Sequence, residues 1–408
     1  MNNKSDKLLS LQIAGLQGFY WMIFCPIYSF ASVYLLSRDF SNQKIGWMMA
    51  SSSVAAIILQ PALGALIDRY KKYSPKFVMT CLSAVCLILL CGVIWLDVGM
   101  LGMAVMYVGV LALLLTMQPL VNALTFEYIN AGHDVSFGVT RAAGSILFAV
   151  LSTLLGVWVG KASTAILPII CLVLFACYFL LLQNFNTVST PVSADKRTGE
   201  DERIPLDQSV GFLRRYDRFV PFLFGCMFIF LFHNVINTFL AQIIASVNGN
   251  DTQFGISLTI AAVCELPAFL GFSWLAARIE TRSLLKASGI FYALRSFIFL
   301  LAGSVWMVNF GQVLQGLSFA IFIPGSVYYI NQIMHEKDRV KGQTFVTGAS
   351  TVGSFFGSVI GGWLLDHSGV HGLLIYGSIA AVIGGFLLVY AIRKPKPQAK
   401  MQVIEEPS

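Results

Sequence analysis

The amino-acid sequence predicts an all-α membrane protein in which twelve transmembrane helices form two pseudo-symmetric halves of six helices each. Three observations lead to this fold class. Hydrophobic residues make up 57% of the 408 residues and charged residues only 12%, whereas soluble domains carry about 25% charged residues. The apolar residues are gathered in runs of roughly 20 or more, the length needed to cross a bilayer. A single long hydrophilic segment divides these runs into six and six.

The twelve predicted helices follow one another through short polar connections, and hydropathy marks their approximate bounds. In the first half they cover residues 12–36, 44–67, 76–97, 101–129, 137–160 and 163–184. In the second half they cover residues 219–247, 252–277, 283–303, 305–333, 342–365 and 370–392. The intervening segment carries too little apolar surface to hold a fixed fold. We therefore expect a half at 1–184, a cytoplasmic linker at 185–217, a half at 218–392 and a cytoplasmic tail at 393–408.

The distribution of lysine and arginine predicts the orientation of the chain. If the N-terminus is cytoplasmic, 22 of the 27 basic residues fall on the cytoplasmic side, and only Arg38, Lys44 and Lys161 fall in outer segments. Such a bias is the positive-inside signal, so both termini are predicted to be cytoplasmic and the first helix to remain uncleaved in the inner (plasma) membrane. The net charge of +7 reflects this topology. We expect the lipid bilayer, and no nucleic acid, as a partner.

The cysteines do not indicate a disulfide framework or a metal site. All eight lie within the apolar runs, where cysteine behaves as a small hydrophobic residue. The sequence contains no Cys-x-x-Cys pair, no His/Cys cluster and no nucleophile elbow. We therefore expect no metal, no cofactor and no enzymatic activity.

One acid stands alone within a very apolar helix. Glu265 lies in the run from Leu258 to Leu270, without an adjacent cation. An ionised side chain at that depth costs at least ~2.5 kcal/mol, so such a residue usually faces a cavity or a partner. We interpret Glu265 as the best single indication of a substrate or proton site, with a structural pairing to a buried arginine as the alternative.

The two halves repeat several positions in the same order. Gly46 opens the second run and Gly255 opens the eighth, 209 positions later. Gly156 near the end of the fifth run is matched by Gly361 near the end of the eleventh. Together these echoes suggest a duplicated unit, and duplicated helical halves with a site at their interface are a common plan for transporters.

The sharpest motif runs from residue 64 to residue 72 and reads Gly-Ala-Leu-Ile-Asp-Arg-Tyr-Lys-Lys. With the twelve helices and the central linker, it resembles the major facilitator superfamily, whose signature is a glycine, then Asp-Arg and basic residues in this loop. The resemblance implies that Gly64, Asp68 and Arg69 form a gating loop that holds one conformation of the two halves. Glycine would let neighbouring helices approach closely there. An ordinary positive-inside loop would explain the basic residues but not Gly64 with Asp68.

A second motif, Phe-Gly-Val-Thr-Arg-Ala-Ala-Gly at 137–144, is similar to the pattern of the lactose-permease-like branch, which includes phenylpropionate-permease-like proteins. The resemblance assigns substrate binding to Arg141 and Glu265, stacking on the substrate to Phe148, and a charge pair to Arg295. An aromatic face combined with guanidinium donors is suitable chemistry for a sugar ring.

Several positions depart from lactose permease, and amides occupy them. Asn234 and Asn237 stand where that protein has two acids, and Gln312 and Gln315 stand where it has ionisable groups. Amides suit a polyhydroxylated ligand because each offers a donor and an acceptor. Hydrogen bonding between helices is the alternative interpretation. Further amides in the predicted cavity-lining helices are Gln118, Asn122 and Gln242.

The same departures restrict the choice of proton carrier. Because the acids of the seventh and tenth helices are missing, Glu265, Glu127 or His233 must carry the proton if the chain couples to protons. We expect Glu265 to be protonated from the outer side, the substrate then to bridge Glu265 and Arg141, and both to leave inward as the halves rock.

The sequence thus predicts a monomeric secondary active transporter for proton-coupled uptake of a small polar organic solute, a sugar or an oligosaccharide, by alternating access. An aromatic-acid or nucleoside permease and an uncoupled facilitator are alternatives. Drug efflux is less favoured because the fifth helix has no proline between Arg141 and Gly160, where antiporters of this superfamily carry a Gly-Pro motif. A non-transporting sensor also remains open, since buried charges can serve binding alone.

Overall fold

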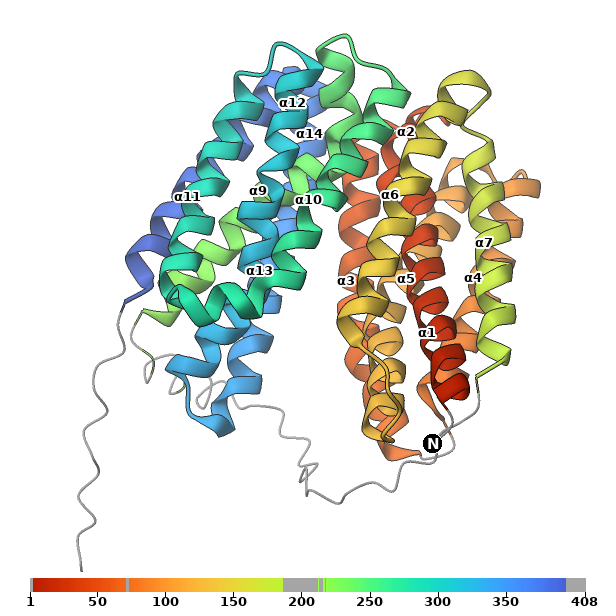
Figure 1. The fold of residues 1–408 in the computed structure, drawn as a ribbon. Coiled ribbons are helices and arrows are strands. Elements are labelled where there is room, and N and C mark those ends of the chain that lie inside the picture. The colour runs from red at the N-terminus through yellow and green to blue at the C-terminus, as the bar shows by residue number, and fades with distance from the viewer. Residues whose placement is uncertain (1–2, 71–72, 186–211, 213–215, 217, 394–408) are drawn as a thin grey trace, which may run out of the picture.

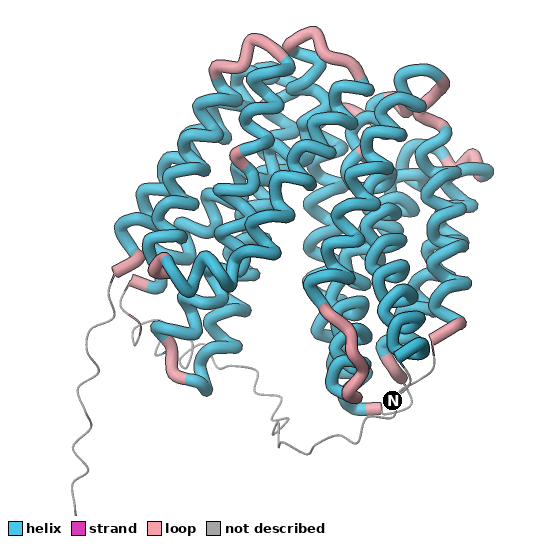
Figure 2. The backbone as a smooth tube through the Cα atoms, in the orientation of Figure 1, coloured by secondary structure: helices cyan, strands magenta, loops and turns pink. Residues whose placement is uncertain are grey.

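The computed structural model describes residues 3–70, 73–185, 212, 216 and 218–393. These residues form helices joined by short loops, and no strand occurs among them (Figure 2). The predicted linker 185–217 and tail 393–408 lie almost entirely outside the described residues. The helices of the first half are α1 (Asn3–Phe24), the π-helix η1 (Cys25–Ser29), α2 (Ala31–Leu36), α3 (Asn42–Arg69), α4 (Pro75–Trp95), α5 (Gly99–Asn130), α6 (Phe137–Lys161) and α7 (Ile166–Gln183). Those of the second half are α9 (Phe219–Ser246), α10 (Asp251–Arg278), α11 (Thr281–Leu300), α12 (Val305–Val313), α13 (Gln315–Ile333) and α14 (Glu336–Ala391).

The helices correspond to twelve membrane crossings. Within the described residues, 11 helical segments are long and apolar enough to span a membrane, and the last of them covers 54 residues, Asp338–Ala391. A continuous helix of that length would measure ~80 Å, far more than the ~30 Å of hydrocarbon in a bilayer. Gly369, with φ 66° and ψ −170°, interrupts it. The hydroxyl of Tyr376 donates to the carbonyl of Phe356 across the turn, so the two arms of α14 lie side by side.

The first and tenth crossings are broken rather than continuous, and the seventh, α9, is kinked at Phe239. The first passes from α1 through a π-helical turn containing Pro26, and the tenth is divided into α12 and α13 at Leu314. A break leaves backbone carbonyls without helical partners, and in a membrane these must be satisfied inside the protein. The buried hydroxyl of Tyr107 donates to the carbonyl of Ile27 within the π-helical turn, at 2.7 Å. The predicted runs 12–36 and 305–333 therefore each cross the membrane with a local interruption.

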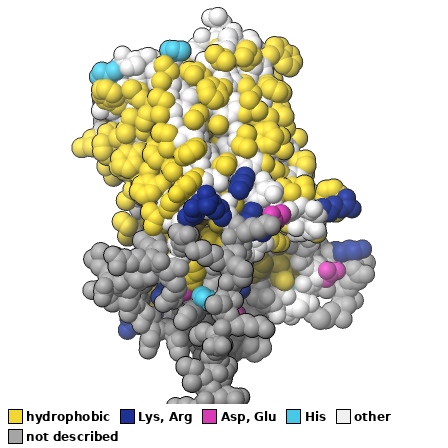
Figure 3. All heavy atoms as spheres, turned by 90° about the vertical axis from the view of Figure 1, so that its left-hand side faces the viewer, with side chains coloured by type: hydrophobic (Ala, Val, Ile, Leu, Met, Phe, Trp, Pro, Cys, Tyr) yellow, Lys and Arg dark blue, Asp and Glu magenta, His cyan; other side chains and the backbone are white. Residues whose placement is uncertain are grey.

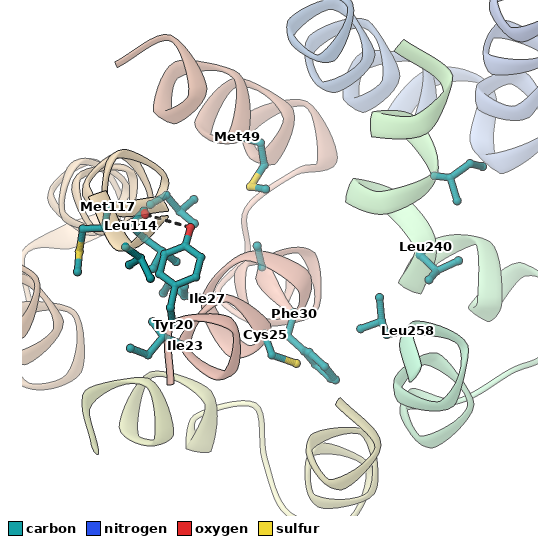
Figure 4. Close-up of a cluster of buried hydrophobic side chains, with 14 of the residues drawn as sticks. Tyr20, Ile23, Cys25, Ile27, Phe30, Met49, Leu114, Met117, Leu240 and Leu258 are labelled. Atoms are coloured by element: carbon teal, nitrogen blue, oxygen red, sulfur yellow. Dashed lines mark hydrogen bonds between the residues drawn. The ribbon is translucent and has the colours of Figure 1, made fainter. Parts of the chain in front are cut away.

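The apolar side chains divide between an interior cluster and an outer surface. Figure 4 shows part of the interior, where Tyr20 of α1 donates its hydroxyl to the carbonyl of Leu114 on α5 at 3.3 Å. Large apolar side chains also remain on the outside, such as Trp306, which is 83% exposed. Figure 3 shows hydrophobic side chains covering the upper part of one face, with lysine and arginine side chains along its lower border. This arrangement suits a lipid-facing band beside a polar boundary.

The first and last six crossings form two bundles that diverge toward the end of the molecule carrying the N-terminus (Figure 1). At the opposite end, α3 packs against α14 and α6 packs against α10. We call this the closed end, defined by Asn42 and Gly46 of α3, Gly156 of α6, Gly255 of α10 and Asp366 of α14. Phe30, between η1 and α2, also stacks edge-on against Phe254 of α10 there, with ring centroids 4.8 Å apart.

Glycines make the two helix crossings of the closed end possible. A Cβ at Gly255 would collide with the carbonyl of Ser152, and one at Gly156 would lie 3.0 Å from the Cα of Gly255. A Cβ at Gly46 would likewise collide with the carbonyl of Ser358. The repeated glycines of the sequence are thus the points at which the two halves touch.

One glycine contact between the halves lies one residue away from the position that the sequence repeat indicated. The glycine of α14 that approaches the backbone of Asn42 is Gly362, whereas the sequence echo pairs Gly156 with Gly361. Gly361 instead packs within its own half, against Phe239 and Leu373. The difference arises because sequence similarity records residue types, while close contact depends on which side of the helix faces the partner.

Candidate functional site

Glu265 of α10 is joined to a buried arginine through a glutamine. Gln315 of α13 donates its Nε2 to Glu265 Oε1 at 2.6 Å, and its Oε1 accepts from the guanidinium of Arg295 on α11 at 2.5 Å. Glu265 also interacts electrostatically with Arg295 and Arg141. Among the described residues neither arginine forms an ion pair with it. The side-chain amide of Gln315 therefore connects the carboxylate of Glu265 to the guanidinium of Arg295, which do not contact each other directly.

Arg295 is fully buried and is held by the broken tenth crossing. Its Nε donates to the carbonyl of Gly311 at 2.9 Å, and its Nη2 donates to Gln312 Oε1 at 2.7 Å. The break at Leu314 brings these acceptors to the guanidinium. Two neighbouring buried donors, Arg295 Nη1 and Gln312 Nε2, have no hydrogen-bond partner among the described residues. Buried donors are usually satisfied, so these two mark a polar interior that can bind a further acceptor.

Arg141 of α6 is positioned by an aromatic ring and a hydroxyl. Its guanidinium carbon lies 4.1 Å from the ring centroid of Trp21 on α1, and its Nη1 donates to Ser145 Oγ at 2.9 Å. A Cβ at Gly144 would lie 2.6 Å from Trp21, so the second glycine of the motif is what admits this ring. The sequence contained Trp21, but helix spacing alone could not place it on Arg141.

The remaining predicted residues have separate surroundings. His233 of α9 stacks on Phe319 with ring centroids 4.2 Å apart, and its Nε2 shares a 2.8 Å hydrogen bond with Asn237 Nδ2. Asn234 is buried and accepts from Ser358 of α14 at 2.7 Å, which ties two helices of one half together. Asn234 therefore makes a hydrogen bond between helices, which was the alternative to ligand binding for these amides.

Two predicted residues, Phe148 and Glu127, lie apart from these hydrogen-bonded groups, whereas two predicted amides belong to the network around Arg295. Phe148 of α6 is partly buried and packs against the apolar core. Glu127 is partly buried near the end of α5. Gln312 and Gln315, expected to bind substrate, are instead bonded to Arg295. In this conformation both amides hold the guanidinium of Arg295 and do not line the cavity.

The predicted gating loop belongs to the end of a helix. Gly64 and Arg69 lie in the last turns of α3, and the side chain of Asp68 lies outside the described part of the chain. A Cβ at Gly64 would have open space on all sides. No other helix among the described residues approaches Gly64 in this conformation, because the two bundles are separated at that end, so the gating role of this loop stays a prediction.

A cavity of about 550 Å³ lies between the halves, on the side away from the closed end. It is lined by side chains of α3, α5, α9, α13 and α14, with Tyr28 of η1. None of Arg141, Phe148, Glu265, Gln312 and Gln315 belongs to this lining. Gln118 and Asn122 do, as the amide pattern indicated. The hydroxyl and amide side chains missed by the sequence analysis are Tyr28, Ser53, Gln60, Ser326, Gln343, Thr347, Ser350, Thr351 and Ser354.

The signal for those residues was present but was not distinctive. Serine and threonine occur widely in membrane helices, where they bond to the backbone of their own turn. Only the positions of the neighbouring helices show that these ones face a cavity. In the described part of the chain, no group of three His, Cys, Asp or Glu side chains lies close enough to hold a metal ion.

Twelve crossings in two bundles, a cavity between them and a buried charge network define a membrane transporter. Residues 12–376 match the model of the MFS_1 like family. The chain therefore belongs to this family of the major facilitator superfamily, and the resemblance read from its motifs is confirmed at that level. The members of this superfamily are transporters rather than enzymes.

Two of the relatives in sequence match nearly the whole chain. The maltose permease of Geobacillus stearothermophilus is 24% identical over 394 residues, which cover 93% of this chain and 94% of the permease. The uncharacterized transporter YwbF of Bacillus subtilis (strain 168) is 21% identical, with 94% of each chain covered. The crystal structure of the nucleoside transporter NupG superimposes with a TM-score of 0.78 at 17% identity, covering 95% of this chain and 99% of that one. This last similarity shows the fold alone.

Proposed function

We propose that this protein is a monomeric secondary active transporter that takes up a sugar or oligosaccharide together with protons across the plasma membrane. The observation that carries the proposal is the buried bridge from Glu265 through Gln315 to Arg295, in a protein that also has a cavity lined by amides and hydroxyls. The full-length similarity to a maltose permease supports a sugar as the substrate. The positive-inside bias supports cytoplasmic termini. The conformation described here is then open to the cytoplasm.

Glu265 is the proposed proton carrier because its charge is balanced only at a distance. As a carboxylate it accepts from Gln315 and interacts with two arginines; once protonated, it can donate a hydrogen bond and no longer balances them. A substrate that bridges Glu265 and Arg141 would then stabilise the protonated form. This link between proton and substrate binding is what symport requires, since each must change the affinity for the other.

A nucleoside permease is the second candidate. Tyr28, Phe230 and Phe322 line the cavity beside its polar wall, and aromatic faces can stack on a nucleobase. Uptake assays with uridine and with maltose separate the two candidates. Preferential uptake of uridine would identify a nucleoside permease, and preferential uptake of maltose would identify a sugar transporter.

The test uses the full chain in proteoliposomes with an imposed pH gradient, acid outside. We expect maltose to accumulate in wild-type vesicles, and Glu265→Gln to reduce this accumulation at least tenfold while exchange of internal for external maltose continues. Glu336→Gln, at the exposed start of α14, is the matched control and should retain accumulation. Full gradient-driven accumulation in Glu265→Gln would refute the assigned proton carrier.

Other outcomes discriminate the alternatives. If Glu127→Gln or His233→Gln loses accumulation while Glu265→Gln retains it, the substituted residue, and not Glu265, is the proton carrier. Uptake by the wild type that ignores the gradient would identify an uncoupled facilitator. Binding of maltose without any flux would identify a sensor.

A further inference from the structure

One wall of the cavity is a face of α14 that is polar apart from Val346. The wall consists of side chains that carry a hydroxyl or an amide and are spaced by three or four residues, or adjacent: Gln343, Thr347, Ser350, Thr351 and Ser354. This spacing puts them on the same side of a helix. We call this set the α14 wall.

The hydroxyls of the α14 wall present acceptors to the cavity. Thr347 donates its proton to the carbonyl of Gln343 at 3.1 Å, Ser350 to that of Val346 at 2.8 Å, and Thr351 to that of Thr347 at 3.0 Å. A hydroxyl has one proton and two lone pairs. Because their protons are engaged along the helix, the oxygens are left to accept hydrogen bonds. The complementary ligand is one that offers many donors.

The facing wall supplies both kinds of group. Gln60 of α3 donates its amino group to the carbonyl of Leu115 at 3.1 Å, which leaves its oxygen as an acceptor. Asn122 of α5 accepts from Gln17 at 3.1 Å, which leaves its amino group as a donor. A complementary ligand therefore offers hydrogen-bond donors toward α14 and both donors and acceptors toward the facing wall. The hydroxyl groups of a polyol provide both kinds of group.

Charge and length narrow the class of ligand. The described lining residues include no Asp, Glu, Lys, Arg or His, so an ionised ligand would find no counter-charge within it. The α14 wall extends from Gln343 to Ser354, a rise of ~16 Å along the helix. This exceeds the length of one pyranose ring. The cavity of about 550 Å³ is likewise larger than a single hexose.

We propose that the α14 wall is a subsite for an uncharged, extended, hydroxyl-rich ligand, a short oligosaccharide, and that it selects for chain length. The proposal rests on the proposed function, and it adds residues that the Glu265 network does not include. One sugar ring occupies the part of the cavity near Asn122, and further rings lie along α14 toward Gln343. Aromatic acids are disfavoured there because their carboxylate would remain unpaired.

Isothermal titration of the purified full chain with glucose, maltose and maltotriose tests the subsite. We expect the wild type to bind maltotriose at least tenfold more tightly than glucose. The double variant Thr347→Val with Thr351→Val removes two acceptors at nearly constant volume, so its affinity for maltotriose should fall about tenfold and that for glucose less than threefold. Thr344→Val is the matched control, because Thr344 bonds to Val340 on the same helix but lies outside the lining.

A chemical variant of the ligand tests the acceptor argument separately. Deoxyfluoro maltotriose, in which fluorine replaces hydroxyl groups, keeps nearly the same size but loses those donors, so we expect it to bind no more tightly than glucose. Retained glucose binding and an unchanged melting temperature confirm that the double variant is folded.

The possible results separate the two proposals. An unchanged ratio of maltotriose to glucose affinity in the double variant, or wild-type preference for glucose, uridine or hydrocinnamate, would overturn the subsite. Flux of sugar in proteoliposomes would still uphold the transporter in that case. Chain-length selection without any flux would uphold the subsite and overturn the transport function.

Discussion

Asp366 fastens the two halves together at the closed end. Its carboxylate lies in α14 and accepts from the backbone N–H of Asn42 at 3.1 Å and of Gln43 at 2.8 Å. It also accepts from the side chain of Asn42 at 2.8 Å. Because these two N–H groups open α3, the acid caps the positive end of a helix in the other half. We predict that Asp366→Asn weakens the conformation described here.

The size of the effect follows from what the amide loses. Asparagine keeps one acceptor oxygen, so one N–H of α3 loses its partner and the negative charge at the helix end disappears. Hydrogen bonds to a charged group contribute about 1.5–3 kcal/mol, and a charge at a helix end about 0.3–1 kcal/mol. Asp366 is exposed, so solvent reduces both contributions, and we expect a net change of about 1 kcal/mol. This corresponds to about a fivefold shift between the two conformations.

Electron–electron distance measurements between spin labels can detect this shift. Labels at positions 69 and 278, the last residues of α3 and α10, report the separation of the halves at the end opposite the closed end. The eight native cysteines are first replaced. The fraction with the long distance should fall in Asp366→Asn but not in Asp97→Asn, a neutralised acid in the loop between α4 and α5 at the same end. Equal fractions in wild type and Asp366→Asn would refute this role of Asp366.

Two further predictions follow from the contacts. Gly255→Val should prevent α10 from packing against Ser152 at the closed end, and should abolish the long-distance population in the same measurement. Gly271→Val, on the same helix but with open space around it, should leave that population unchanged. A long-distance population retained in Gly255→Val would contradict the packing argument. Gln315→Leu leaves Glu265 and Arg295 without their shared partner, so it should lower unfolding stability by about 2–3 kcal/mol. Thermal unfolding checks this against Gln332→Leu, an exposed position of α13, and equal melting temperatures would show that the bridge contributes nothing.

Much of the fold could be predicted because hydropathy acts residue by residue. Each crossing needs a long apolar run, and the runs were visible without knowledge of their neighbours. The breaks in the first and tenth crossings could not be predicted in the same way, although Pro26 was visible. Their stability depends on partners from elsewhere, such as Tyr107 for Ile27 and Arg295 for Gly311.

The candidate site was predicted in part. Glu265, Arg141 and Arg295 stood out because charges are rare in apolar helices. The roles of the amides could not be distinguished, since an amide can bind a ligand or a neighbouring helix equally well. Asn234 bonds to Ser358 and Gln315 bridges two charges, whereas Asn122 lines the cavity.

The sequence by itself determined the membrane fold, the number of crossings, the family and the costly buried charges, because each depends on composition along a single segment. The tertiary structure alone decided that Gly156 meets Gly255, that Asp366 caps α3 and that the hydroxyls of α14 face a cavity. These contacts depend on the rotation of each helix about its axis and on the relative position of the two halves. Hydropathy does not record either quantity, since a polar residue lowers it equally whichever way it faces.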